Sequence, residues 1–527
     1  MGHDVIARPA TDCFGLEWGR ARTRSAQTRP SLDLKTPKTT VLYFNPIMQI
    51  FASYPGRSVL HPKSLFNPGL SLKQISFHLH KCAPCPAMAV LLLLAGLLLP
   101  AHFSFSQSRD RQAAGPVYIS EVMVLQQHTL ADPDFGGYAG WMELHNPRRR
   151  SRDLDGWVLA MYPPETELTS GAFLENHMAR TEPLHMEVFP KGIFIASGEY
   201  LLIWADGRDT IATAWHAGFT LPEFGAVIAL YRPANGGLRL ADILPYTALD
   251  VAPDISLGRI SFDRHQDVGY LLPLNIPTPG SANRLARLKL QETHRLRIAD
   301  PSGLSPDHTG NYLWSVSDRP GGGIYKLTLD GRIVKRLDVK GSDLEGIAQN
   351  PVDKTLWIVD ETFWQIIQFD TLGQELHRFE LDMEPRRMNL GLEGITIDPV
   401  RNIIYAANEK SPRVIVEVDV GLPDESRQLR TLPVNFGANP DTRGLDLSGL
   451  YYDVEEELIW LVSDEARAVF VLDRNARPLA AFDAGQVRLE GIAVIRDRGA
   501  IYLVNDDPQM LFKFEYPDPL VRLPANR

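Results

Sequence analysis

The sequence predicts an all-β protein in which a β-sandwich is followed by a five-bladed β-propeller. Two observations lead to this prediction. One short phrase, a small or acidic residue followed by glycine and an aliphatic residue, returns five times in the C-terminal half of the chain. Between residues 116 and 285, short runs of alternating apolar and polar residues are separated by Asn-Pro and Asp-Gly turns, a pattern typical of strands.

The five copies of the phrase are regularly spaced. Their glycines are 43, 48, 55 and 42 residues apart. Strand-rich repeats of about 40–50 residues are typical of a β-propeller, with one blade per repeat. Because a propeller brings equivalent residues of all blades to one axis, we expect distant side chains to meet in a single site. The repeated glycines are Gly303, Gly346, Gly394, Gly449 and Gly491.

Each copy continues with the pattern of a whole blade. Residues 356–361 of the second copy are an apolar run that favours a strand and ends in an acidic pair. A third strand, a turn such as the Asp-Gly pair at 330–331, and an outer strand follow. The fifth copy instead runs into two prolines at 517–519. We therefore expect residues 290–298 to supply its outer strand and to close the ring without an open edge.

The segment 116–285 resembles the lamin-tail domain, an immunoglobulin-like β-sandwich found on exported bacterial proteins. The resemblance implies a binding or adhesion module, in which Glu143 and Asp155 have structural roles at strand ends and turns. The segment around 160–195 departs from the pattern and is expected to be an insertion of unknown structure. The matching phrases are I-S-E-V at 119–122, W-x-E-L-x-N-P at 141–147, L-x-G-W-x-L at 154–159 and T-P-G-x-x-N at 278–283.

The N-terminal part predicts export. Residues 1–80 show little periodicity, and we expect them to be an unstructured or non-native segment upstream of a translation start near 79–88. In residues 81–106, a basic flank precedes an apolar run at 88–99, which spans about 18 Å as a helix, short of the roughly 30 Å membrane core. This is the pattern of a signal peptide. The alternative is an uncleaved anchor that associates the protein with the membrane.

Composition agrees with an exported binding protein. The three cysteines, Cys13, Cys82 and Cys85, all precede the expected cleavage site near residue 106, so the mature protein would contain no thiol or disulfide. The net charge of −10 provides no basic surface for nucleic acid.

Two series of acids in the segment 290–520 predict a metal site. One series starts inner strands and the other follows second strands, so both are expected at one mouth of the axial channel. Gathered carboxylates repel one another and must take up protons or hold a cation. Oxygen ligands without His or Cys suit Ca²⁺ better than Zn²⁺ or Mg²⁺. The alternative interpretation is that the acids cap strand ends. The candidate metal ligands are Glu345, Glu393, Glu490, Asp446, Glu361, Glu409 and Glu465.

The same half of the chain resembles the SdiA-regulated family of exported bacterial propellers, distant relatives of NHL-repeat proteins. The resemblance covers residues 295–516 and implies a five-bladed ring with bound calcium and no established reaction. The phrases that carry it are D-L-E at 343–345, L-E-G-I at 392–395 and 489–492, D-L-S-G at 446–449, and the acid-containing segments at 360–361, 408–412 and 463–468.

The sequence favours a binding protein over an enzyme. Residues 107–527 contain no G-x-S-x-G, H-E-x-x-H or P-loop motif. Lys410 and Arg467 each stand beside a candidate acid and either bind an anion or compensate charge. We expect an exported, calcium-binding propeller that acts in surface or ligand binding, with an extracellular or envelope ligand of unknown identity. The alternative is a calcium-dependent hydrolase of phosphate or lactone esters at the propeller mouth.

Overall fold

A computed structural model describes residues 117–164, 171–262, 269–341, 343–383, 391–410, 412–434 and 445–517, which all belong to one compact unit. The predicted upstream segment, signal peptide and cysteines lie outside these residues. The described part is all-β, as predicted, and its α-helix is α2 (Gly171–Arg180). None of the helices in the described residues has the length and apolar content needed to cross a bilayer.

The first structural part is a two-sheet sandwich. Apolar side chains of both sheets, such as Val122 and Met142 on one and Leu159 and Ile228 on the other, share one buried cluster. The larger sheet has the order β13 (Tyr270–Leu274), β12 (Ser256–Ile260), β1 (Tyr118–Met123), β2 (Gly140–His145), β7 (Tyr200–Ala205), β9 (Trp215–His216) and β8 (Thr210–Ile211). The smaller sheet has the order β11 (Gly237–Thr247), β10 (Gly225–Ala234), β4 (Val158–Tyr162) and β5 (His185–Val188).

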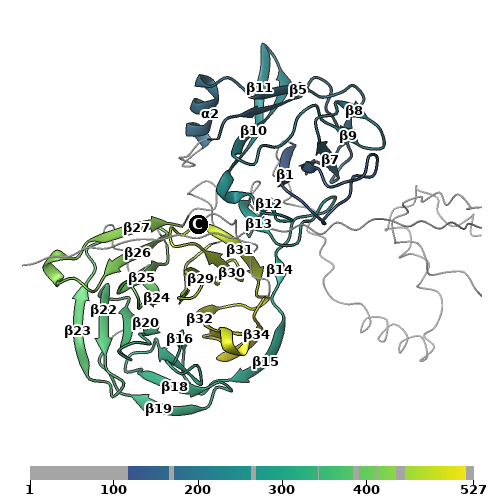
Figure 1. Ribbon diagram of the computed structural model, residues 1–527. Coiled ribbons are helices and arrows are strands. Elements are labelled where there is room, and N and C mark those ends of the chain that lie inside the picture. Colours follow the sequence, from purple (N-terminus) through teal and green to yellow (C-terminus); the bar gives the residue numbers. More distant parts are fainter. Residues whose placement is uncertain are drawn as a thin grey trace, which may run out of the picture. The chain divides into compact units, whose positions relative to one another are not determined.

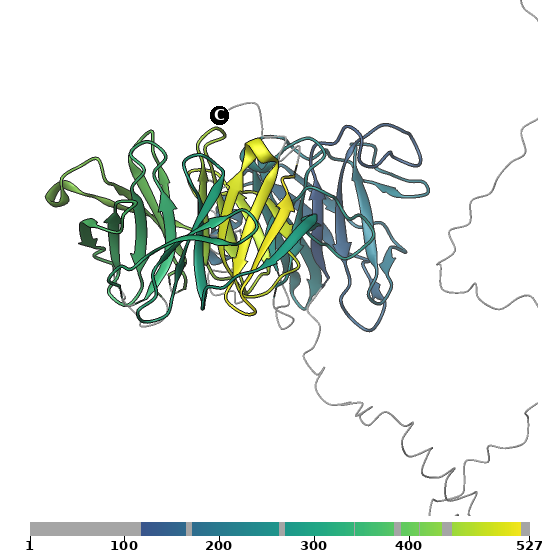
Figure 2. The same ribbon diagram turned by 90° about the horizontal axis from the view of Figure 1, so that it is seen from below.

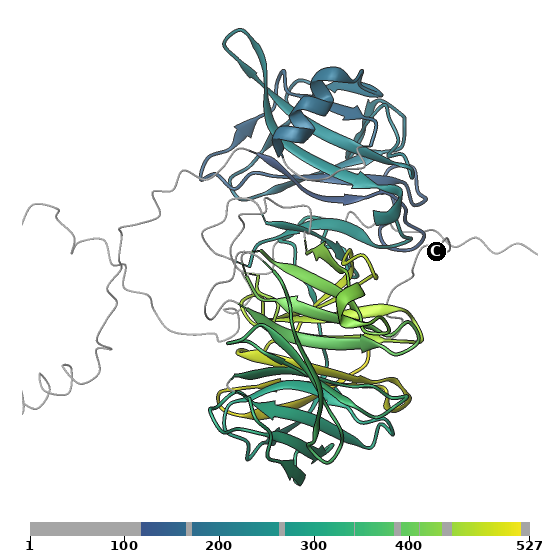
Figure 3. The same ribbon diagram turned by 90° about the vertical axis from the view of Figure 1, so that its left-hand side faces the viewer.

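The segment expected to be an insertion carries regular structure. Helix α2 lies across the smaller sheet, where Leu174 and Met178 pack on Tyr162 of β4 and Val227 of β10 (Figure 3). After the helix, β5 pairs with β4 and forms the edge of that sheet. A minor pair, β3 (Arg152–Asp153) with β6 (Phe194–Ile195), joins the chain before the segment to the end of the segment.

The second part is a β-propeller, in which the sheets surround one axis (Figure 1). The first three sheets are β16 (Pro301–Pro306), β17 (Tyr312–Ser317), β18 (Ile324–Thr328) and β19 (Ile333–Leu337); β20 (Leu344–Gln349), β21 (Leu356–Asp360), β22 (Gln365–Phe369) and β23 (Glu375–Glu380); and β24 (Leu392–Asp398), β25 (Ile403–Asn408), β26 (Val414–Asp419) and β27 (Leu429–Pro433). The fourth holds β28 (Gly449–Asp453), β29 (Leu458–Ser463), β30 (Ala468–Leu472) and β31 (Pro478–Asp483); the fifth holds β32 (Leu489–Ile495), β33 (Ala500–Asn505) and β34 (Met510–Glu515).

The repeated glycines allow the inner strands to pack closely around the axis. A Cβ on Gly346 would lie within 3.0 Å of the backbone at Glu393 and Gly394, and one on Gly394 would lie within 3.0 Å of the backbone at Ser448 and Leu450. The same relation links Gly449 to residues 490–491, Gly491 to Gly303, and Gly303 to residues 345–347. These contacts therefore form a closed ring, in which the inner strand of the fifth sheet packs on that of the first. Only a residue without a side chain fits at these positions.

The ring closes with a strand from before the first sheet. As predicted, β15 (Leu290–Arg295) pairs antiparallel with β34 and becomes the outer strand of the fifth sheet (Figures 1 and 2). An additional strand was not predicted: β14 (Ala286–Arg287) pairs in parallel with β31 at Phe482 and Asp483 and extends the fourth sheet. Strands β14 and β15, which precede the first propeller sheet in the sequence, are thus edge strands of the fourth and fifth sheets.

Candidate metal centre

Three glutamates of the first acidic series stand at the beginning of inner strands. Glu345 lies in β20, Glu393 in β24 and Glu490 in β32, each directly before a repeated glycine. Because these glycines pack against the neighbouring inner strand, the residue before each of them lies at the same end of the ring. The equivalent positions in the other two sheets hold Ser302 and Ser448.

A repeated backbone hydrogen bond brings the second series to the same end. The residue after each second strand donates its N–H to the carbonyl two residues before the inner-strand position. These bonds are Asp318 N to Asp300 O at 3.1 Å, Glu361 N to Asp343 O at 3.0 Å, Glu409 N to Gly391 O at 2.9 Å and Asp506 N to Arg488 O at 3.4 Å. In the fourth sheet, Glu465 N donates instead to the carboxylate of Asp446, at 3.1 Å. Both series therefore share one end of the axial channel, which we call the acidic mouth.

The first series is held in surroundings that disfavour negative charge. Burial raises the pKa of Glu345 well above its usual range, and the nearby charges of Asp318 and Glu490 raise it further. Burial, together with the charges of Glu345 and Glu490, does the same for the pKa of Glu393. Burial and the neighbouring acids raise the pKa of Glu490 to about 8. These groups repel one another, as expected for carboxylates brought close together.

The second series is perturbed in the same direction. Burial raises the pKa of Glu361 to about 7, although its Oε1 accepts a 2.9 Å hydrogen bond from Gly391 N. Burial also raises the pKa of Glu409 and of Asp446. The Asp446 carboxylate is fixed by the hydroxyl of Ser463, 2.5 Å away. Asp446 is buried and stands two residues before Ser448.

The closest group of acids includes a residue that the sequence analysis missed. Carboxylate oxygens of Asp318, Asp343 and Glu345 all lie within 4.8 Å of one another, and burial with the Asp343 carboxylate raises the pKa of Asp318 to about 6. Asp343 stands two residues before Glu345, the same spacing as Asp446 before Ser448. This shared spacing is the feature of the sequence from which Asp343 could have been predicted as a member of the site.

The two candidate anion-binding residues differ in position. Lys410 lies among the acids, with its ammonium 2.5 Å from Glu409 Oε1 and 3.2 Å from Glu465 Oε1. Arg467 is exposed, and within the described residues its side chain forms no ion pair with these acids. Glu465 is also partly exposed and pairs with Lys410, so it belongs to the rim of the acidic mouth.

The donor set of the acidic mouth fits a hard cation. The side-chain oxygens gathered there belong to carboxylates and hydroxyls, and none of the residues of the acidic mouth named above is His or Cys. The single positive charge of Lys410 is smaller than the combined negative charge of the carboxylates described above. Flexible oxygen ligands in excess are the environment that Ca²⁺ accepts, whereas Mg²⁺ requires a strict octahedron.

The fold and this site define a β-propeller protein with an acidic axial mouth. Residues 285–515 match the family described as SdiA-regulated, the same family that the repeated phrases indicate. A search of curated proteins found no match.

Solved structures with a similar arrangement include the β-propeller domain of Cps50 (Swd1) from Myceliophteria thermophila, with 13% identity, 44% of this chain and 72% of that chain covered, and a TM-score of 0.30. A chain of a nidogen/laminin complex has 17% identity, coverages of 39% and 72%, and a TM-score of 0.28. Hydrazine synthase of Kuenenia stuttgartiensis has 14% identity, coverages of 40% and 56%, and a TM-score of 0.26.

Proposed function

We propose that this protein is an exported, calcium-binding, five-bladed β-propeller with an immunoglobulin-like, lamin-tail-like sandwich, and that it acts in binding a surface or envelope ligand. The observation that carries the calcium proposal is the mutual repulsion of Glu345, Glu393 and Glu490 at one end of the ring. A divalent cation would remove that repulsion while keeping the carboxylates ionised.

The arrangement of the neighbours supports a bound ion over simple strand capping. Backbone N–H groups satisfy Glu361 and Asp446 only in part, with one oxygen of each engaged by the bonds described above. Glu393 is influenced by four other carboxylates and by no cation among its main neighbours. Strand capping explains single acids but does not explain why so many converge.

Calcium titration of the Glu393→Gln variant tests the proposal. The amide keeps the shape of the side chain and removes its charge. We expect the wild-type protein to bind Ca²⁺ in isothermal titration calorimetry, and the variant to bind at least about tenfold more weakly, a loss of about 1.4 kcal/mol.

The matched control is Glu417→Gln, a glutamate of the same sheet that pairs with Arg430 at 3.1 Å outside the acidic mouth. Its calcium affinity should equal that of the wild type. Equal binding by the wild type and Glu393→Gln, or no binding by the wild type, would refute the calcium site.

One observation favours a second candidate function, a calcium-dependent hydrolase of phosphate or lactone esters. Glu361 and Glu490 have pKa values of about 7 and about 8, the range in which a carboxyl group can act as a general acid or base near neutral pH. Turnover on a panel of phosphoesters and lactones, lost in Glu393→Gln while folding is retained, would support this function. A calcium-loaded protein inactive on the panel supports binding alone.

A further inference from the structure

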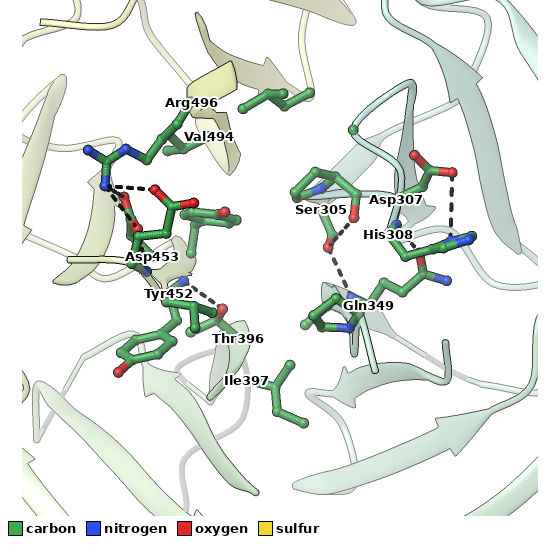
Figure 4. A pocket seen from close by; sticks show the side chains of 18 of the residues that line it. Ser305, Asp307, His308, Gln349, Thr396, Ile397, Tyr452, Asp453, Val494 and Arg496 are labelled. Atoms are coloured by element: carbon green, nitrogen blue, oxygen red, sulfur yellow. Dashed lines mark hydrogen bonds and ion pairs between the residues drawn. The ribbon is translucent and has the colours of Figure 1, made fainter. Parts of the chain in front are cut away.

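A cavity lies at the end of the inner strands opposite the acidic mouth. Its volume is about 250 Å³. Glu345 is the second residue of β20, whereas Ala348 and Gln349 at the end of the same strand line the cavity. Every inner strand contributes to the wall, which includes Ser305, Gln349, Thr396, Tyr452 and Val494 (Figure 4). The cavity is therefore separate from the acidic mouth and independent of the function proposed above.

Hydrogen bonds between sheets hold the wall in place. Ser305 Oγ accepts a bond of 3.0 Å from Gln349 N, and Thr396 Oγ1 accepts a bond of 2.8 Å from Tyr452 N. All four residues are buried. Between these polar contacts, Ile397 and Val494 present apolar surface to the cavity. A preformed cavity with an apolar wall and a few fixed polar groups is typical of small-molecule sites.

One side of the cavity carries excess negative charge. The Arg496 guanidinium lies 3.4 Å from Asp453 and 3.7 Å from Glu455, so two carboxylates of the cavity wall share one cation. Figure 4 shows Arg496 beside Asp453. Asp497, which also lines the cavity, adds a further carboxylate.

On the facing side of the cavity, the negative charge of Asp307 is paired with a positive charge. There Asp307 pairs with Lys326 at 3.0 Å. Asp307 also lies 4.0 Å from the imidazole of His308 (Figure 4). The charge difference across the cavity therefore gives a ligand one preferred orientation.

We infer that this cavity binds a small organic cation, an aliphatic amine. Its ammonium group would lie toward Asp453, Glu455 and Asp497, where three carboxylates of the cavity wall outnumber the guanidinium of Arg496. Its hydrocarbon part would contact Ile397 and Val494. The cavity is smaller than the roughly 300–1,000 Å³ of drug-sized ligand sites, which restricts the ligand to a short chain.

Three probes with the same four-carbon chain test the charge preference: 1,4-diaminobutane, 1,4-butanediol and succinate. Each is titrated calorimetrically into the full-length protein with calcium present in excess, so that the acidic mouth is not the preferred site for a cation. We expect binding of the diamine only. Equal binding of the diol or of succinate would overturn the proposal.

The double variant Glu455→Lys/Asp497→Lys tests the location. Both residues are exposed, with 76% of the Glu455 side chain accessible, so folding should be retained. We expect at least about tenfold weaker diamine binding, because attraction becomes repulsion at both positions. The control Asp338→Lys reverses an acid that is 85% exposed, outside the cavity, and should leave binding unchanged. A diamine affinity lost in Glu393→Gln but kept in the double variant would assign the amine to the acidic mouth and contradict the inference.

Discussion

At the residue scale, the acidic mouth is asymmetric because serine replaces glutamate in two of the five equivalent positions. Ser302 and Ser448 remove two charges from the centre of the ring. Asp446, two residues before Ser448, adds one carboxylate, and its Oδ1 accepts a hydrogen bond of 2.5 Å from Ser463 Oγ. On the side of the ring that carries Asp318, Asp343 and Glu345, the carboxylate oxygens lie within 4.8 Å of one another. A bound ion would therefore lie off the axis, toward this group.

A second residue-scale feature lies in the sandwich, where His216 is fully buried between carboxylates. Its Nδ1 is 2.9 Å from Asp206 Oδ2, and its Nε2 is 3.0 Å from Asp134 Oδ2. Burial lowers the pKa of His216, but the hydrogen bonds to Asp134 and Asp206 outweigh it, so the pKa is raised above 6.5. The His216 side chain ties the loop that carries Asp134 to β9.

We predict that this contact makes the stability of the sandwich depend on pH. Because the folded pKa is raised, the contribution is fully present below about pH 6.5 and is lost as the pH rises through the folded pKa. His216→Gln should lower the unfolding free energy by about 1–3 kcal/mol at pH 6 and by less at pH 9. Calorimetric unfolding at both pH values measures this. The exposed His128→Gln is the control, and an equal loss at both pH values would contradict the prediction.

At the element scale, the inner strands depend on glycine at the point of closest approach. Gly346 has no room for a Cβ because the backbone of the next inner strand is within 3.0 Å. Backbone atoms cannot move aside as the end of a side chain can.

We predict that Gly346→Ala destabilises the propeller by about 2 kcal/mol or more, the scale of overpacking in a core. The melting temperature, followed by circular dichroism, reports the change. The control is Gly421→Ala, at a turn where the new Cβ would meet only side-chain atoms of Asp419 and Asn402. A melting temperature of Gly346→Ala equal to that of the control would show that the ring adjusts.

The sequence allowed prediction of the elements that repeat and of those with clear periodicity. The phrase around Gly346 and its copies indicated the inner strands, and the missing outer strand of the last copy indicated β15. Strand β14 has only two residues, too few for any periodicity, and its pairing with β31 depends on tertiary structure. Asp343 was overlooked for another reason: it is part of the repeated phrase but precedes the strand, where side-chain direction cannot be derived from alternation.

At the scale of the whole molecule, the acidic mouth should determine how stability varies with pH and calcium. The pKa values of Glu361 and Glu490 are raised from 4.5 to about 7 and about 8. Without a cation, folding therefore favours the protonated forms. The contribution of these two groups to stability is highest below about pH 4.5 and falls as the pH rises toward 8.

We predict that, in a chelator, the melting temperature falls between pH 5 and pH 8, and that Ca²⁺ raises it more at pH 8 than at pH 5. The reason is that protons and calcium compete for the same carboxylates. Differential scanning calorimetry with and without Ca²⁺ at both pH values tests this, with Mg²⁺ as the comparison ion. A calcium effect that is equal at both pH values would contradict proton competition.

The pairing of β15 with β34 also bears on how the chain is made. Arg295 finds its partner Met510 only after all the residues between them have been synthesised. At about 5–20 residues per second, the early strand waits on the order of ten seconds or more with a bare edge. During synthesis this edge is open to wrong partners, including the same strand of a neighbouring nascent chain. A chain that terminates early would keep this exposure permanently, so a quality-control protease would have a simple means of recognising it.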